Sequence, residues 1–250
     1  MVQEFLEQTA AAHQNMLWLV TVCVDLGLTL VLFRLFGKTG LYAVVVLNIM
    51  LCNLLGPKIT MVFGFNTTMG AILYSGIYFA TDLLGERYGK REANRAVLIG
   101  FAISVIVVAF GALSLLFLPS ADPGKSVFAN DVHGALSTIF NLTPRFVFGS
   151  LLAYLISQTH DVWMFHFIKD KTKGRHLWLR NNVSTICSQA IDTLVYGLVV
   201  WWAIFDLRTA IELSLVKYFF KVLIALIDTP FIYWARTWDV RHKDWSDSWQ

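Results

Sequence analysis

Several charged side chains lie inside apolar stretches of this chain, at spacings that place them on common helix faces. Asp82 and Glu86 are four residues apart, as are Lys217 and Lys221, and residues four apart lie on one face of an α-helix. An ionisable side chain near the centre of a bilayer costs about 2.5–3.5 kcal/mol on insertion scales, so each one that a chain retains is a candidate functional residue. Carboxylates in such a place can accept hydrogen bonds or carry protons, and a lysine can neutralise one of them.

Further polar residues extend these faces. Ser188 and Asp192 are four residues apart, and Gln189 lies one turn before Asp192. Asp228 lies eleven residues after Lys217, which returns it to the same helix face. Three separate helices therefore each carry a polar stripe, and in a bundle such stripes face one another or a water-filled cavity rather than lipid.

A purely structural role is the alternative for each of these residues. An ion pair such as that of Lys221 with Asp192 would then only fix helix packing, and Glu86 would pair with Lys90 or Arg91 at a membrane surface. The whole set favours a binding site instead, because a surplus of buried acceptors suits a ligand that is rich in donors. The carboxylates are Asp82, Glu86, Asp192 and Asp228, and the lysines are Lys217 and Lys221.

Aromatic residues accompany the carboxylates. Tyr74 and Tyr78 precede Asp82 at four-residue spacing, and Tyr196 follows Asp192 by four residues. Aromatic faces hold a flat ring by stacking, while carboxylates accept hydrogen bonds from ring N–H groups and exocyclic amines. These residues therefore suit a purine-like base, unless the aromatic side chains only pack between helices.

The elements that must position these residues are long apolar segments. The chain has 250 residues, of which 15% are charged, and a mean hydropathy of +0.59, whereas a soluble domain averages about 25% charged residues. A spanning helix needs about 20 mostly apolar residues. Segments of that kind run over 16–36, 40–56, 69–84, 96–118, 146–167, 183–204 and 212–234, and the longest loop is 119–144. The sequence predicts an all-α polytopic membrane helix bundle with about seven transmembrane helices, and excludes a soluble enzyme, a disordered chain and a disulfide scaffold.

Loop charges predict the orientation of the chain in the membrane. Of its 20 Lys and Arg residues, fourteen fall beyond the first, third, fifth and seventh segments, and four fall in the loops on the other side. Basic loops stay in the cytoplasm. We therefore expect a multi-pass protein of the bacterial inner (plasma) membrane, with its N-terminus outside and its C-terminus in the cytoplasm.

Catalytic, metal and nucleic-acid signals are weak. Gly37-Lys38-Thr39 resembles the end of a Walker A motif, but Leu32 occupies the position of its first glycine, and neither HExxH nor GxSxG occurs. His160 and His166 are six residues apart and do not share a helix face, so no metal site is expected. A net charge of +3 does not indicate nucleic-acid binding. We expect no enzyme activity, no catalytic residues and no cofactor; an intramembrane enzyme would need a nucleophile and base set that is not recognisable here.

Three stretches resemble the queuosine-precursor transporter family, also called the vitamin uptake transporter family. The first runs from Lys58 to Phe101, KITMVFGFNTTMGAILYSGIYFATDLLGERYGKREANRAVLIGF, and contains the signature Thr81-Asp82-Leu83 with Glu86 and Tyr88-Gly89-Lys90. The second is HDVWMFHFIKDKTKGRHLWLRNNVSTICSQAIDTLVY, residues 160–196, and the third is KYFFKVLIALIDTP, residues 217–230. The resemblance as a whole extends over roughly residues 41–235, with the three stretches in the same order and at compatible spacing.

The resemblance implies a fold and a substrate class. Members resemble the substrate-binding subunits of energy-coupling-factor vitamin transporters in helix number, and are thought to work without a dedicated ATPase. Their substrates are 7-deazaguanine precursors of queuosine, a modified tRNA nucleoside: 7-cyano-7-deazaguanine, its aminomethyl analogue or queuine. The family positions that match here are Asn53, Asp82, Glu86, Asp161, Asp192 and Lys221. Against a six-helix family core at 40–235, residues 1–39 add one N-terminal helix, and 236–250 form a polar cytoplasmic tail.

The sequence thus predicts a membrane importer that binds a deazaguanine base in a central cavity. The alternative is a substrate-binding subunit that depends on a separate ATPase module. Besides the small-molecule substrate and the bilayer, a second copy of the chain is a candidate partner, and nucleic acid is not. The predicted substrate-binding residues are Asn53, Tyr74, Tyr78, Asp82, Glu86, Gln189, Asp192, Lys221 and Asp228.

Overall fold

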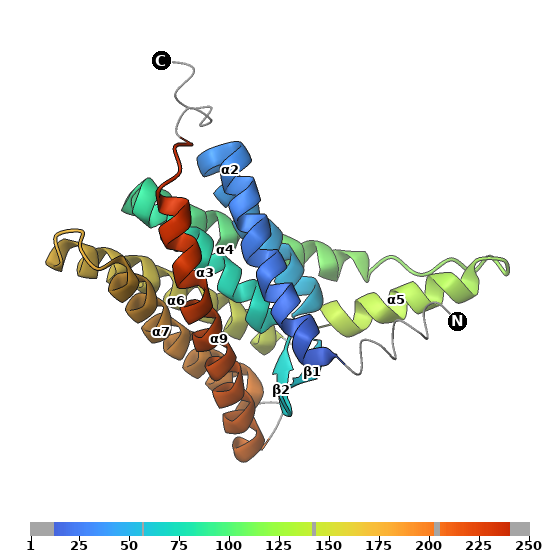
Figure 1. The fold of residues 1–250 in the computed structure, drawn as a ribbon. Helices are drawn as coiled ribbons and strands as arrows, with labels where there is room; N and C mark the ends of the chain where they lie inside the picture. Colours follow the sequence, from blue (N-terminus) through green and yellow to red (C-terminus); the bar gives the residue numbers. More distant parts are fainter. Residues whose placement is uncertain (1–12, 57, 142–143, 203–205, 241–250) are drawn as a thin grey trace.

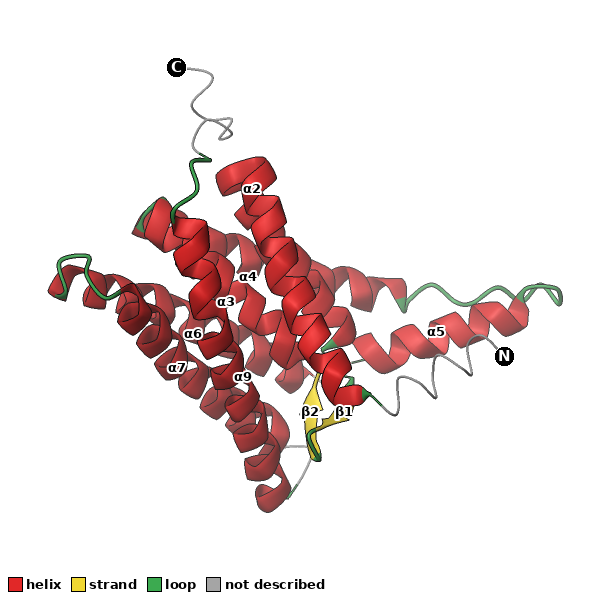
Figure 2. Cartoon of the chain, viewed as in Figure 1, coloured by secondary structure: helices red, strands yellow, loops and turns green. Residues whose placement is uncertain are grey.

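The chain folds as a bundle of long helices with one small β-hairpin (Figures 1 and 2). This computed structural model describes residues 13–56, 58–141, 144–202 and 206–240. The all-α prediction is confirmed. The elements are α2 (Gln14–Leu55), β1 (Ile59–Val62), β2 (Phe65–Thr68), α3 (Gly70–Arg87), α4 (Lys90–Ser114), α5 (Ser126–Phe140), α6 (Pro144–Lys171), α7 (Leu177–Tyr196), the π-helical turn η1 (Gly197–Trp201) and α9 (Leu207–Arg236).

Helix α2 consists of two antiparallel arms. Gly37 interrupts it with φ 56° and ψ −132°, and a β-carbon on Gly40 would collide with the carbonyl oxygen of Leu32. A straight helix would hold those two residues about 12 Å apart along its axis, so the chain must reverse at Gly37, as Figure 1 shows. The first arm (residues 14–36) and the second arm (residues 38–55) match the predicted segments 16–36 and 40–56.

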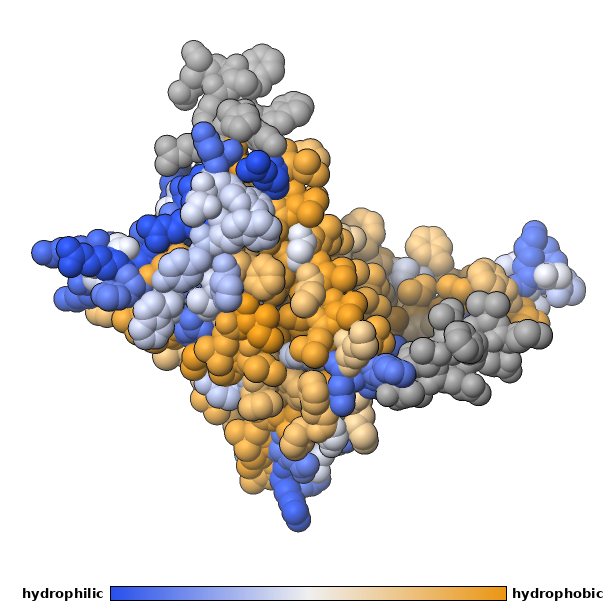
Figure 3. Space-filling view, viewed as in Figure 1, coloured by the Kyte–Doolittle hydropathy of each residue, from blue (hydrophilic) through white to orange (hydrophobic). Residues whose placement is uncertain are grey.

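Three helical stretches are long and apolar enough to cross a membrane. They are Gln14–Leu55, Lys90–Ser114 and Leu177–Val200 in the described part of the chain. Large apolar side chains such as Leu98 and Phe110 face outward, and orange, hydrophobic residues dominate the middle of the surface in Figure 3. Charged and amide side chains are buried inside, which is the arrangement expected of a bundle surrounded by lipid. The count of seven spans stays a prediction.

Helix α3 lies at the centre and packs against α2, α4, α6 and α9. Almost all of its side chains between Ala71 and Gly85 are buried. A β-carbon on Gly76 would collide with the Asp25 carboxylate and the Asn48 amide, one from each arm of α2. Small residues let membrane helices approach closely, and here the approach buries Asp25 against α3 and the second arm.

The two ends of the bundle differ in charge. At one end, which we call the basic end, Arg87 donates hydrogen bonds to the carbonyl oxygens of Arg236 and Trp238, and Lys38 pairs with Glu92 at 3.7 Å. The loops predicted to share one side of the membrane therefore meet there, while Arg241 and Lys243 lie outside the described residues.

The β-hairpin marks the opposite end, which we call the hairpin end. The Phe63 amide donates to Asn15 and the Thr60 hydroxyl to Gln14, at the start of α2.

The predicted loop at 119–144 contains helix α5, so that prediction is wrong over 126–140. No side chain of α5 is buried. Polar residues such as Asn130 and Asp131 lower the local hydropathy, although the segment alternates apolar and polar residues with helical periodicity. The lower local hydropathy therefore led to the prediction of a loop where the chain forms an amphipathic helix.

Candidate functional site

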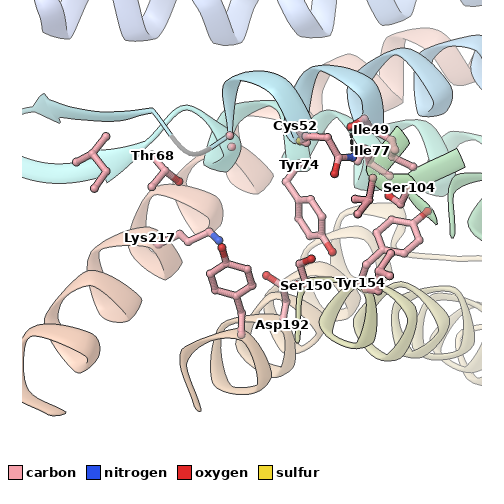
Figure 4. Close-up of a pocket in the computed structure, with 17 residues that line it drawn as sticks. Ile49, Cys52, Thr68, Tyr74, Ile77, Ser104, Ser150, Tyr154, Asp192 and Lys217 are labelled. Carbon is pink, nitrogen blue, oxygen red and sulfur yellow. Dashed lines mark hydrogen bonds between the residues drawn. The ribbon is translucent and has the colours of Figure 1, made fainter. Parts of the chain in front are cut away.

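A cavity of about 240 Å³ lies in the half of the bundle next to the hairpin end. Figure 4 shows side chains from α2, α3, α4, α6, α7 and α9 converging on it. Its lining residues are Ile49, Cys52, Asn53, Gly56, Ile59, Thr68, Gly70, Tyr74, Ile77, Ser104, Val108, Ser150, Leu151, Tyr154, Asp192, Tyr196 and Lys217.

Aromatic rings and ammonium groups form much of the wall of the cavity. The rings of Tyr74 and Tyr154 meet edge to face with centroids 6.1 Å apart. The Lys217 ammonium lies 4.1 Å from the centroid of the Tyr196 ring, a cation–π contact. Such a wall can hold a flat ring and a polar substituent at the same time.

An ion pair closes the inner side of the cavity. The Lys221 ammonium donates to Asp192 Oδ2 at 2.5 Å and lies 4.4 Å from the centroid of the Tyr74 ring. Both partners are buried, with side chains 0% and 5% exposed. The pair considered above under the structural alternative is therefore present. It also places a carboxylate, an ammonium and an aromatic face beside the cavity.

Below the cavity lies a layer of buried polar groups with unused hydrogen-bonding capacity. The Tyr78 ring lies 5.7 Å from that of Tyr74. Within the described residues, the Tyr78 hydroxyl and both amide atoms of Gln189 have no hydrogen-bond partner. Most buried polar groups in proteins are paired, so this layer has a capacity for further donors and acceptors.

Deeper still, three carboxylates from different helices approach the same face of α7. Thr185 donates to Asp82 of α3 at 3.2 Å, and Asn181 donates to Asp228 of α9 at 3.0 Å. The third is Asp161 of α6, which is fully buried and lies against Asp82. We call Asp82, Asp161 and Asp228 the carboxylate layer.

Glu86 lies at the basic end, away from the cavity. It pairs with Arg180 at 2.7 Å, Lys169 at 3.2 Å and Arg236 at 3.4 Å. Glu86 therefore pairs with cations, as in the alternative considered above, but these come from α6, α7 and α9 and are not its sequence neighbours Lys90 and Arg91. These contacts, which we call the Glu86 cluster, tie four helices together at one end.

One stripe of α3 connects the four levels, which are the cavity, the Tyr78–Gln189 layer, the carboxylate layer and the Glu86 cluster. Tyr74, Tyr78, Asp82 and Glu86 follow one another at four-residue spacing, so they span about 18 Å along one helix face. Helix α7 runs the other way, with Arg180 at the basic end and Asp192 at the cavity.

The structure distributes the nine predicted site residues over these levels. Asn53, Tyr74 and Asp192 line the cavity, and Lys221 is bonded to Asp192. The lining does not include Tyr78, Gln189, Asp82, Asp228 or Glu86, which lie progressively further from it.

Two prominent lining residues were outside the predicted site. Lys217 shares a helix face with Lys221, and Tyr154 lies seven residues before Asp161 on α6. Helical spacing was therefore a usable signal for both residues.

The chain is similar to known membrane transporters. A family profile described as "Putative vitamin uptake transporter" matches residues 68–235. A "Probable queuosine precursor transporter" of Bacillus subtilis (strain 168) is 33% identical over 223 residues, which cover 89% of this chain and 94% of that protein. The "Queuosine precursor transporter" of Escherichia coli (strain K12) is 29% identical over 169 residues, covering 66% of this chain and 71% of the relative. No solved structure matches the chain.

Proposed function

Because the chain belongs to the family of putative vitamin uptake transporters, we propose that it imports queuosine precursors through the bacterial inner membrane. The substrate would be a 7-deazaguanine base: 7-cyano-7-deazaguanine, its aminomethyl analogue or queuine. The relatives named as queuosine precursor transporters support this substrate class. A transporter of this kind carries a molecule without converting it, so no enzymatic step is included.

The observation that carries the proposal is the buried Asp192–Lys221 pair beside Tyr74 in the cavity. A deazaguanine presents ring N–H and amine donors on one edge, and Asp192 can accept them. Tyr74 and Tyr154 offer faces and edges for the ring, and Asn53 offers an amide. In the empty state Lys221 neutralises Asp192, which offsets the cost of keeping a carboxylate out of water.

The placement of the cavity suits capture from outside the cell. Its lining includes Ile59 and Thr68 of the β-hairpin, whereas the basic end is tied by the Glu86 cluster. By the positive-inside rule the basic end faces the cytoplasm. The described state would therefore receive substrate from the outer side, and import would require the Glu86 cluster to open.

Uptake by living cells tests the proposal. Cells unable to make queuosine precursors would be supplied with a labelled precursor and would express wild type, Asp192→Ala or the exposed control Asp131→Ala. Removing the acceptor is expected to lower uptake about fivefold or more, since an unmatched polar group in a site costs about 1–3 kcal/mol, while Asp131→Ala retains uptake. Full uptake by Asp192→Ala would refute the site.

The alternative, dependence on a separate ATPase, is tested with purified protein. Wild type alone in liposomes without ATP is expected to exchange labelled for unlabelled precursor across the membrane. Exchange that appears only with a partner ATPase and ATP would establish the substrate-binding-subunit function instead.

A further inference from the structure

The carboxylate layer is deeply buried between the cavity and the Glu86 cluster. Asp82, Asp161 and Asp228 are 3%, 0% and 2% exposed, and each comes from a different helix. Three carboxylates so close together and so deeply buried need an explanation, because an unpaired charge in an apolar interior is very costly.

The cations near this layer are engaged elsewhere. From α7, Arg180 bonds to Glu86 and to the carbonyl oxygens of Gly174 and Arg175, and from α9, Lys221 bonds to Asp192. His160 of α6 directs Nδ1 to Ser188. Within residues 13–240 as far as the structure describes them, none of the three carboxylates has an ion pair. The layer is therefore stabilised only by neutral groups.

Asp161 of the layer and Asn181 beside it each have hydrogen-bonding capacity that is not used. Ser184, Thr185 and Ser188 of α7 lie beside Asp161, but neither Asp161 oxygen has a partner in hydrogen-bonding geometry among the described residues. Asn181 binds Asp228 through its amide nitrogen, and its fully buried amide oxygen has no partner there either. A proton bound to one carboxyl oxygen of the layer would supply a hydrogen-bond donor for one of these unpaired oxygens.

Close contact between Asp82 and Asp161 limits their shared charge. Two carboxylates side by side in a low-dielectric site cannot both be ionised, so such a pair keeps one proton between them. A metal ion is a poorer solution, since no group of three His, Cys, Asp or Glu side chains in the described residues is placed to hold one.

We propose that Asp82 and Asp161 bind one transported proton, and that the protein is a symporter of this proton and its substrate. This inference rests on the transport function proposed above. The proton would add to a carboxylate oxygen when the layer is open to the outer side, and would leave the same oxygen when it is open to the cytoplasm. The shared stripe on α3 links Asp82 to Tyr74 of the cavity and to Glu86, so one movement of α3 would act on the cavity, the carboxylate layer and the Glu86 cluster together.

Liposomes containing the purified full-length chain separate proton coupling from transport itself. Counterflow, in which labelled 7-cyano-7-deazaguanine exchanges for unlabelled at equal pH, measures transport alone. Net accumulation under a pH gradient, alkaline inside, measures coupling. With one proton per substrate, a gradient of one pH unit is expected to support about tenfold accumulation by wild type.

Matched variants locate the proton site. Asp161→Asn keeps the size of the side chain and removes its titration, so it is expected to retain counterflow and to lose gradient-driven accumulation. Asp25→Asn is the control, since Asp25 is also buried, at 7% exposure, but lies beside Asn48 and outside the layer. This control is expected to retain both activities.

Three results would overturn the inference. Counterflow by wild type without any effect of the pH gradient would refute coupling and leave the transport function intact. Accumulation driven by a sodium gradient at equal pH would assign the site to another cation. Absence of counterflow with all three deazaguanines would refute the transport function and this inference with it.

A second measurement does not depend on the folding of a variant. A pH-sensitive dye inside wild-type liposomes is expected to report acidification when substrate is added outside. An unchanged internal pH during substrate uptake would also refute proton symport.

Discussion

At the scale of single residues, the contribution of the Asp192–Lys221 pair to stability can be tested separately from its proposed role in substrate binding. Breaking a buried ion pair by removing one partner costs about 3–5 kcal/mol, because the other charge is stranded, whereas replacing both by apolar residues is often neutral. We therefore expect Asp192→Leu and Lys221→Met each to lower thermal stability in detergent, and the double variant to recover most of the loss.

Uptake by the same double variant distinguishes binding from packing. If Asp192 accepts hydrogen bonds from the substrate, the stable double variant remains inactive in uptake. Wild-type uptake by that variant would show instead that the pair serves only to pack helices.

Residue types and spacing predict part of this site. Asn53, Tyr74 and Asp192 stand out as polar or aromatic residues in apolar segments, and the structure brings all three to one cavity. The partners of Glu86 could not be predicted, because Arg180 is 94 positions away and only the packing of the whole bundle decides which cations arrive. Local periodicity predicts which residues share a helix face, but it does not predict which other helix packs against that face.

At the scale of elements, close packing of α3 against both arms of α2 depends on Gly76. A β-carbon there would collide with Asp25 and Asn48. We expect Gly76→Ala to lower stability by about 1–3 kcal/mol, as overpacking does, and to be detectable as a lower unfolding temperature in detergent.

Gly27 is the matched control for this substitution. It lies within α2, which packs against α3, but a β-carbon on Gly27 would meet nothing within 4 Å. Alanine there is expected to leave stability unchanged or to raise it slightly, since glycine in a helix interior is unfavourable by about 0.5–1 kcal/mol. Equal loss in both variants would contradict close packing at Gly76.

The elements themselves were predictable to different degrees. Two apolar segments separated by Gly37-Lys38-Thr39 indicate two helices, and the structure contains them as the arms of α2. The tightness of the reversal follows from Gly37, whose dihedral angles are unfavourable for residues with a side chain, and from Gly40, where a β-carbon would collide with Leu32. Helix α5 was missed because segments chosen by apolar content exclude an amphipathic helix that buries no side chain.

At the scale of the whole molecule, the cavity and the Glu86 cluster lie at opposite ends of one polar interior. Loop charges predicted that fourteen of the basic residues share one side, and Lys38, Arg87, Lys169, Arg180 and Arg236, which are among them, lie at one end of the structure. The loop charges did not predict that the basic end is closed, because closure depends on three cations from α6, α7 and α9 that pair with the Glu86 carboxylate.

Cys52 offers a measure of which end is open. It lines the cavity, whereas Cys23 is exposed outside it. In a Cys23→Ser/Cys187→Ser background, we expect a membrane-impermeant maleimide added outside the cell to label Cys52, and added 7-cyano-7-deazaguanine to slow the labelling. Labelling that is insensitive to substrate would contradict a binding site in this cavity.

Glu86→Gln is expected to shift the equilibrium between the state open to the outside and the state open to the cytoplasm toward the cytoplasmic one. The amide cannot form ion pairs with Arg180, Lys169 and Arg236, so the state with a closed basic end loses its main electrostatic ties while the cavity keeps its lining. A change of about 1.4 kcal/mol in the relative free energy of the two states alters their ratio tenfold. We therefore expect labelling of Cys52 from outside to slow severalfold, and labelling in inside-out vesicles to become faster. Asp239→Asn, at the same end but outside the Glu86 cluster, should leave both rates unchanged; a uniform change in both variants would mean that net charge rather than the cluster holds this end closed.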